Sequence, residues 1–129
     1  MTEPRWLTFS VVLAIHADQI SNHGGFGGLR DRGLLESALE RPRHRYHCEP
    51  DSDLAGLAAS YGFGIAKNHP FVDGNKRVAF QAMYVLLGLN GLRITASEED
   101  VVSPMLSVAS GDLGEEDLTS WLEANTGPR

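Results

Sequence analysis

The chain has 129 residues, with 17 Asp or Glu against 11 Lys or Arg and a formal net charge of −6. An acidic chain is a poor non-specific ligand of nucleic acid, because neutralised phosphates supply most of that affinity, so we expect no direct nucleic-acid binding. The length suits one domain over residues 1–129, and a single cysteine excludes an internal disulfide. We find no signal sequence or membrane span, which favours a cytoplasmic protein.

The first part of the chain predicts a helix and a glycine loop. Thr8 is a favoured N-cap type, and the helix is expected from Phe9 to about Ser21. Its apolar residues lie roughly on one face: Val11, Val12, Ile15 and Ile20. This spacing puts His16 on or near the polar side. The segment Gly24–Gly28 matches neither a Walker A loop nor a dinucleotide fingerprint, so we interpret it as a flexible turn or a lid.

The next segment predicts a second helix followed by a basic cluster. Gly33 to Glu40 has helical spacing, and Pro42 is expected to end the helix. Arg41–His47 is the one basic cluster in an acidic chain. Two interpretations of this cluster are about equally favoured. The first is a solvated linker, and the second is a surface that contacts a target or an acidic partner segment.

Two apolar segments predict the helices at the centre of the fold. Leu54 to Lys67 is rich in Ala and Leu at helical spacing, with Ser52 as its expected N-cap. Its small residues allow close packing against neighbouring helices. Asn75 to about Leu89 is apolar nearly all round, so we expect it to be the central buried helix. Asn90 and Gly91 mark its end.

The rest of the chain predicts a short extended segment, Leu92–Thr95, and two more helices. A helix capped by Ser97 is expected to be kinked or shortened by Pro104, and the last helix covers Glu115–Ala124. No stretch alternates convincingly enough for a sheet. The sequence therefore predicts an all-α fold, a single-domain bundle of about six helices whose central buried helix is entered from the loop at 69–77.

That loop, His69–Arg77 or HPFVDGNKR, contains most of the reactive side chains. The first turn of a helix presents unpaired backbone N–H groups and partial positive charge, which together bind anions. Lys76 and Arg77 would be unfavourable there without an external negative charge. Asn75 adds a side-chain donor, and Gly74 allows the backbone to approach a ligand closely. The sequence therefore predicts a phosphate site.

Two further residues of the loop suit phosphate chemistry. His69 accepts a proton near neutral pH. Asp73 suits Mg²⁺, which prefers few carboxylates together with phosphate oxygens. Asp is also a favoured N-cap, and the two roles are compatible. Phe71 is expected to anchor the loop in the core rather than to react.

The pattern His-Pro-Phe-x-Asp-Gly-Asn followed by Lys76-Arg77 resembles the signature of the Fic/Doc superfamily. Most Fic proteins have Gly where Lys76 stands, so the chain looks like the death-on-curing (Doc) toxin branch. Further similarity to that branch lies at His16–Ile20, Gly24–Gly25, Leu29–Asp31, Leu89–Gly91 and Ala109–Asp112. The resemblance thus covers nearly the whole chain.

The resemblance implies a Ser/Thr protein kinase of a toxin–antitoxin module that uses ATP and Mg²⁺. It would transfer the γ-phosphate of ATP to a hydroxyl of a translation factor, with elongation factor Tu as the expected target, and so block translation. By this resemblance His69 is the general base and Asp73 holds Mg²⁺. The phosphate-binding residues are then Gly74, Asn75, Lys76 and Arg77. The implied partner is a Phd-like antitoxin whose C-terminal segment lies in an apolar groove beside the first helices.

Two alternatives stay open. AMP-transferring Fic proteins usually have Gly at the position of Lys76 and a second Arg at the position of Phe80. Both departures count against AMP transfer, although the phosphate cradle itself serves either reaction. The other alternative is a decayed Fic fold that only binds a partner. Four intact motif residues count against it: His69, Asp73, Asn75 and Arg77.

Overall fold

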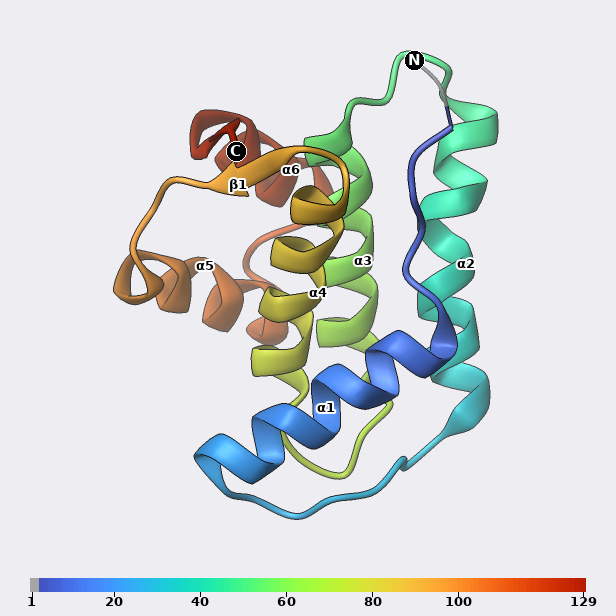
Figure 1. Ribbon diagram of the computed structural model, residues 1–129, viewed down its shortest axis with the longest axis vertical. Coiled ribbons are helices and arrows are strands. Elements are labelled where there is room, and N and C mark those ends of the chain that lie inside the picture. Colours follow the sequence, from blue (N-terminus) through green and yellow to red (C-terminus); the bar gives the residue numbers. More distant parts are fainter. Residues whose placement is uncertain (1–2) are drawn as a thin grey trace.

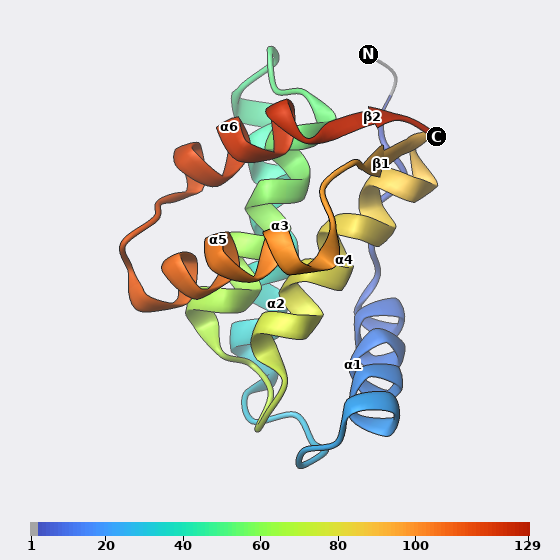
Figure 2. The same cartoon turned by 90° about the vertical axis from the view of Figure 1, so that its left-hand side faces the viewer.

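The computed structural model describes residues 3–129, and helices make up most of it (Figure 1, Figure 2). The helices are α1 Phe9–His23, α2 Arg32–Cys48, α3 Leu54–Asn68, α4 Asn75–Leu89, α5 Glu98–Ser110 and α6 Glu115–Ala124. The predicted all-α class is confirmed. Residues 1 and 2, which the one-domain expectation includes, lie outside the described part. None of the described helices is both long and apolar enough to cross a membrane.

Helices α3 and α4 form the central pair (Figure 1). Small residues let them approach closely, as predicted: a Cβ on Gly62 would lie 2.5 Å from the sulfur of Met83 on α4. On the other side of α3, a Cβ on Gly64 would lie 3.3 Å from Ala38 of α2. α3 is buried along almost its whole length, whereas α4 keeps an open face on which Tyr84 is 50% exposed. The loop at 69–74 therefore joins the two most buried helices.

The helix starts follow the expected capping chemistry with one exception. The hydroxyls of Thr8 and Ser97 accept from backbone N–H groups in the first turns of α1 and α5, as predicted. The prediction that Ser52 caps α3 is wrong. Asp53 is the cap, and its Oδ1 accepts from Gly56 N at 2.8 Å. Asp53 stands directly before the first helical residue, so its short carboxylate reaches the free N–H group.

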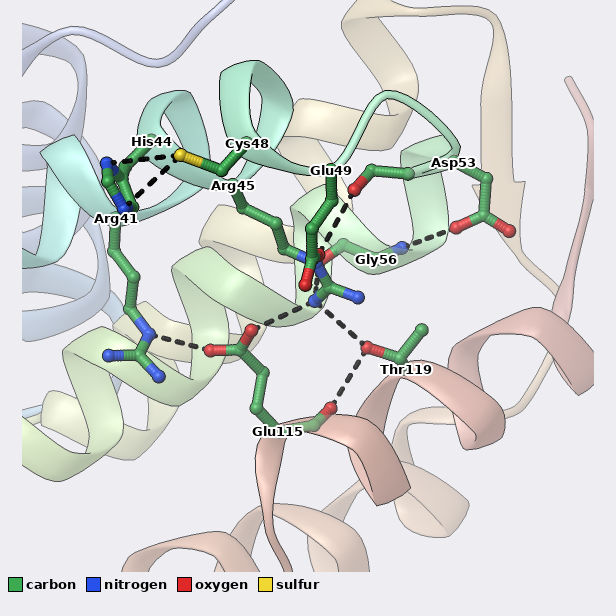
Figure 3. Close-up of polar contacts among 10 residues, drawn as sticks. Arg41, His44, Arg45, Cys48, Glu49, Asp53, Gly56, Glu115 and Thr119 are labelled. Atoms are coloured by element: carbon green, nitrogen blue, oxygen red, sulfur yellow. Dashed lines mark hydrogen bonds and ion pairs between the residues drawn. The ribbon is translucent and has the colours of Figure 1, made fainter.

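The second helix is twice as long as the sequence suggested, because the expectation that Pro42 ends it is wrong. α2 continues to Cys48, with Pro42 buried inside it. Tertiary contacts hold the helix beyond the proline (Figure 3). Arg41 Nε lies 2.6 Å from Glu115 Oε1, and Arg45 Nη1 lies 2.9 Å from Glu115 Oε2. The basic cluster is therefore not a linker.

This ion-pair cluster joins three helices. Arg45 Nη1 also donates to the carbonyl of Gly56 on α3 at 2.9 Å, so one guanidinium links α2, α3 and α6 (Figure 3). The side chains of Arg45 and Glu115 are only 18% and 19% exposed. Partial burial makes such a pair stronger than a surface ion pair, and it makes the loss of either partner costly. The cluster thus compensates for the backbone hydrogen bond that Pro42 cannot make.

Pro104 likewise lies inside a helix, and α5 runs on to Ser110 beyond it. The predicted extended segment after α4 is a strand, β1 Leu92–Ile94, which pairs antiparallel with β2 Thr126–Pro128. The sequence missed β2, because three residues that include Gly and Pro carry no strand signal. This two-stranded sheet is the one departure from the all-α prediction among residues 3–129.

Both ends of the described chain attach to the far end of α4. The side chain of Asn90 accepts from Arg5 N at 2.9 Å and donates to Arg5 O at 3.1 Å. Arg129 donates from its backbone N to Gly91 O and from its side chain to Gly88 O, each at 3.0 Å. The loop that enters α4 lies at the opposite end of the helix (Figure 1).

Tyr61 of α3 predicts an alkaline loss of stability. It is fully buried, its hydroxyl oxygen accepts from Leu7 N at 3.1 Å, and burial raises the pKa of Tyr61 to about 12. Because the folded state favours the neutral phenol, its contribution to stability is complete below about pH 10 and is lost as the pH rises toward 12.

We therefore expect the free energy of unfolding of the wild type, relative to Tyr61→Phe, to fall by up to about 2–3 kcal/mol across that range. Urea titrations of both proteins at neutral and at strongly alkaline pH measure this difference. A gap between them that stays constant with pH would contradict the prediction.

Candidate active site

The loop between α3 and α4 has a tightly specified backbone. α3 ends at His69 in the left-handed conformation, with φ 49°, and α4 is capped by Gly74 at φ 78°. The antiparallel bridge between Leu29 and Phe71 holds the middle of the loop, and Val72 N donates to Gly28 O at 3.0 Å. The loop at 69–74 and the segment between α1 and α2 thus lie side by side at one end of the molecule (Figure 1, Figure 2).

Phe71 and His16 form the floor of the loop. Phe71 is 1% exposed, and its ring stacks on that of His16 with centroids 3.9 Å apart and planes 6° from parallel. His16 Nε2 lies 2.9 Å from the backbone oxygen of Asp73, where a ring N–H donates. The expectation that His16 lies on the polar side of α1 is therefore wrong. The buried face of α1 is Val12, His16 and Gln19, because the loop itself covers that face.

Asn75 fastens the loop to the start of α4. Its Oδ1 accepts from Phe71 N and its Nδ2 donates to Phe71 O, each at 2.9 Å. The same Nδ2 lies 3.4 Å from Nδ1 of His69, a long contact that orients the ring without fixing its tautomer. Asn75 is buried, so its amide is committed to these partners. What it can offer an anion is its backbone N–H.

Asp73 does not cap α4, so the alternative that it serves as the N-cap is wrong. Its Oδ1 accepts from Gly74 N at 2.8 Å, and its Oδ2 accepts from Phe26 N at 3.3 Å. The glycine loop lies directly on this carboxylate, since a Cβ on Gly25 would be 2.6 Å from Oδ2. Only glycine at position 25 permits that approach.

A pocket of about 230 Å³ opens at the start of α4. It is lined by His69, Val72, Asp73, Gly74, Asn75, Lys76 and Arg77. The backbone N–H groups of residues 75–77 are the first of the helix, and no acceptor within residues 3–129 pairs with them. Lys76 and Arg77 form no ion pair with any carboxylate in that range, although Arg77 Nη2 donates to Gly24 O at 3.1 Å. The pocket is therefore positive and rich in donors.

The ligands around Asp73 suit a magnesium ion only if a bound phosphate supplies further oxygen ligands. No group of three or more His, Cys, Asp or Glu side chains gathers into a metal site in the described chain. Mg²⁺ is commonly held by one or two carboxylates while phosphate oxygens and water complete its coordination. Asp73 lies beside the free N–H groups of α4, so its single carboxylate suits that arrangement.

A second cleft of about 280 Å³ adjoins the first, between the end of α1, α4 and α5. It is lined by Gln19, His23, Lys76, Arg77, Phe80, Gln81, Glu98, Val101, Val102, Met105 and Leu106. Val102 and Leu106 are 55% and 51% exposed, so α5 presents apolar side chains to solvent here. Lys76 and Arg77 line both hollows. Sequence reasoning expected an apolar groove beside the first helices but did not identify the contribution of α5.

The fold and the site together define a helical protein in which a loop carrying one histidine and one carboxylate leads into an anion-binding helix start. Residues 6–87 match the model of the Fic/DOC family. The chain belongs to this family, and the resemblance seen in the loop sequence is confirmed.

Two relatives extend the match. The chain is 31% identical over 102 residues to the protein "Protein kinase doc" of Escherichia phage P1, covering 79% of this chain and 80% of that protein. It is 40% identical over 75 residues to "Toxin Doc" of Mycolicibacterium smegmatis, covering 55% of this chain and 58% of that protein. The similarity thus lies with the Doc members of the family.

Proposed function

We propose that this protein is a Doc-like toxin that transfers the γ-phosphate of ATP to a Ser or Thr hydroxyl of a translation factor. Elongation factor Tu is the expected target. The observation that carries the proposal is the pocket at the start of α4, where three free N–H groups, Lys76 and Arg77 face the same space as His69 and Asp73. The name of the phage relative, a protein kinase, supports phosphoryl transfer.

In this proposal the residues of the loop divide the chemistry between them. His69 is exposed at the pocket and accepts the proton of the target hydroxyl. The hydroxyl oxygen bonds to the γ-phosphorus as the bond from that phosphorus to the departing ADP breaks. Lys76, Arg77 and the N–H groups of α4 stabilise the negative charge. Asp73 would hold Mg²⁺, which neutralises charge on the phosphates when bound.

Lys76 favours transfer of the γ-phosphate of ATP over transfer of AMP. Its side chain lines the pocket where most Fic proteins leave the space of a glycine, and the second Arg typical of AMP transferases is replaced by Phe80. Phe80 lies in the apolar cleft and adds no charge that would hold a further phosphate. The reactive phosphate is therefore the terminal one in this proposal.

The proposal includes inhibition by a Phd-like antitoxin, and the apolar cleft supports this part of it. A C-terminal antitoxin segment with apolar side chains would contact Val102, Met105 and Leu106 of α5. Because Lys76 and Arg77 line both hollows, such a segment would also cover the approach to the phosphates. Binding of one antitoxin segment would then both inhibit the enzyme and cover the exposed apolar side chains of α5.

Intact-mass spectrometry of purified elongation factor Tu tests the proposed reaction. The factor is incubated with this protein and Mg-ATP, and in parallel with a non-hydrolysable ATP analogue. A phosphoryl-sized increase that requires hydrolysable ATP is the expected result. An AMP-sized increase would replace the proposal by AMP transfer. Unmodified factor, with ATP bound in a titration, would overturn this target.

A further inference from the structure

His69 has an unusual backbone that requires support. Among residues 3–129 it is the one non-glycine residue with a positive φ, 49°. This conformation costs of the order of 1 kcal/mol or more and persists only where the surroundings impose it. His69 is also the C-cap of α3, and the last carbonyls of a helix have no partner within it. The structure must supply donors here to hold the histidine in place.

Arg30 supplies those donors from the segment before α2. Its Nε donates to the carbonyl of His69 at 2.7 Å, and its Nη2 donates to the carbonyl of Asn68 at 3.0 Å. These are charge-assisted bonds from a rigid planar fork. A guanidinium at this position also complements the partial negative charge at the end of α3. Arg30 thus binds the carbonyls of the two peptide groups that flank His69, one before the residue and one after it.

The main chain of Arg30 is itself held in place by hydrogen bonds. The backbone N–H groups of Arg30 and Asp31 donate to Pro70 O at 2.7 and 3.0 Å. Asp31 caps α2 through Leu34 N, and the carbonyl of Leu34 accepts from the side chain of Asn68 at 2.9 Å. The start of α2 and the end of α3 are therefore joined by a closed set of hydrogen bonds. Arg30 is the charged member of that set.

We propose that Arg30 is a positioning residue for His69. It touches no reacting group and acts by fixing the peptide that carries the imidazole, so that the ring faces the pocket at the start of α4. The effect of Arg30 on kcat rests on the proposed phosphoryl transfer. The effect of Arg30 on structure, a single conformation of the His69 backbone, does not depend on that activity.

The kinetic test compares three variants. Arg30→Ala removes both bonds, and Arg30→Lys keeps the charge but lacks the planar fork. Arg32→Ala is the matched control, because Arg32 is two residues away and 69% exposed, and its guanidinium contacts Glu36 and the ring of Phe9 rather than the end of α3. We expect Arg30→Ala to lower kcat roughly tenfold to a hundredfold, since a small misplacement of a catalytic group costs that much. The KM for ATP should stay within about twofold, because the phosphate-binding N–H groups are untouched.

Chemical rescue separates positioning from a general loss of structure. Millimolar guanidinium should restore part of the kcat of Arg30→Ala and should leave Arg32→Ala unchanged. Arg30→Lys should fall between wild type and Arg30→Ala. An unaltered kcat in Arg30→Ala would overturn the proposal. A parallel loss of kcat and ATP binding that guanidinium does not restore would also overturn it.

An NMR measurement decides the matter without turnover. The ring signals of His69 and the hydrogen exchange of its backbone N–H, which bonds to Ile65 O, are compared in wild type, Arg30→Ala and Arg32→Ala. We expect shifted or multiple His69 signals and faster exchange only in Arg30→Ala. If the wild type phosphorylates nothing, the proposed function fails while this comparison still stands. Unchanged His69 signals in Arg30→Ala would then refute the role of Arg30 alone.

Discussion

Replacing His69 by alanine is expected to lower phosphoryl transfer by roughly 10²–10⁴-fold, the usual contribution of a general base. His69 is exposed at the pocket, and within residues 3–129 its ring makes one polar contact, a long one of 3.4 Å to Asn75. Little packing is therefore lost with the imidazole, and the melting temperature should change only slightly. The carbonyl that Arg30 binds is still present in the variant. Initial rates from the mass-spectrometric assay, together with thermal unfolding, measure both effects.

Two companion variants make this result specific. His69→Asn also lacks the base, but Asn tolerates the left-handed backbone better than Ala does, so any loss of stability due to φ should shrink while the rate stays low. His44→Ala removes an exposed histidine of α2 outside the pocket and should leave the rate unchanged. A His69→Ala protein that retained its rate would remove His69 from the mechanism.

Asn75→Asp should produce the largest combined loss of stability and ligand affinity. Nδ2 of Asn75 donates to Phe71 O in a buried position, and the substitution places an acceptor against that carbonyl. Leaving such groups unpaired costs about 1–3 kcal/mol, partly offset by the favourable charge at a helix start. The new carboxylate also repels phosphates bound at the adjacent N–H groups, so ATP affinity should fall roughly tenfold or more.

Urea unfolding and calorimetric ATP titration measure these two losses separately. Asn22→Asp is the matched control, because Asn22 is an exposed residue of α1 that bonds only to Asp18 in the described structure. The new carboxylate faces that of Asp18, but both side chains are exposed, so the unfolding free energy should fall by no more than about 0.5 kcal/mol. Wild-type stability in Asn75→Asp would mean that the hydrogen bond from Asn75 Nδ2 to Phe71 O contributes nothing. Undiminished ATP binding would show that the anion does not lie at the start of α4.

The parts of the fold that local chemistry decides were predictable from the sequence. Thr8 and Ser97 cap helices because their hydroxyls reach N–H groups three residues on, and α4 begins at Asn75 as its apolar run indicates. The site loop was located for the same reason, since its polar residues interrupt two apolar helices. These features require no knowledge of distant contacts.

The features that depend on distant contacts were missed. Pro42 stays inside α2 because Glu115, more than 70 residues away in the chain, binds the arginines on both sides of it. His16 was expected near the polar side of α1, but the loop around Phe71 folds over it. The amide of Asn75 was expected to face a phosphate, whereas it is occupied by Phe71. The two hydrogen bonds from Arg30 to the end of α3 had no local signal beyond the resemblance of Leu29–Asp31 to the Doc branch.

The attachment of both chain ends to the far end of α4 has a practical consequence for protein engineering. Arg5 and Arg129 are tied to residues 88–91, whereas the pocket lies at the other end of the same helix. A fluorescent protein or an affinity tag fused at either end would emerge away from the pocket. A circular permutant that joins the two ends by a short linker and opens the chain in the exposed turn near Pro50 would leave every contact of the loop at 69–77 intact.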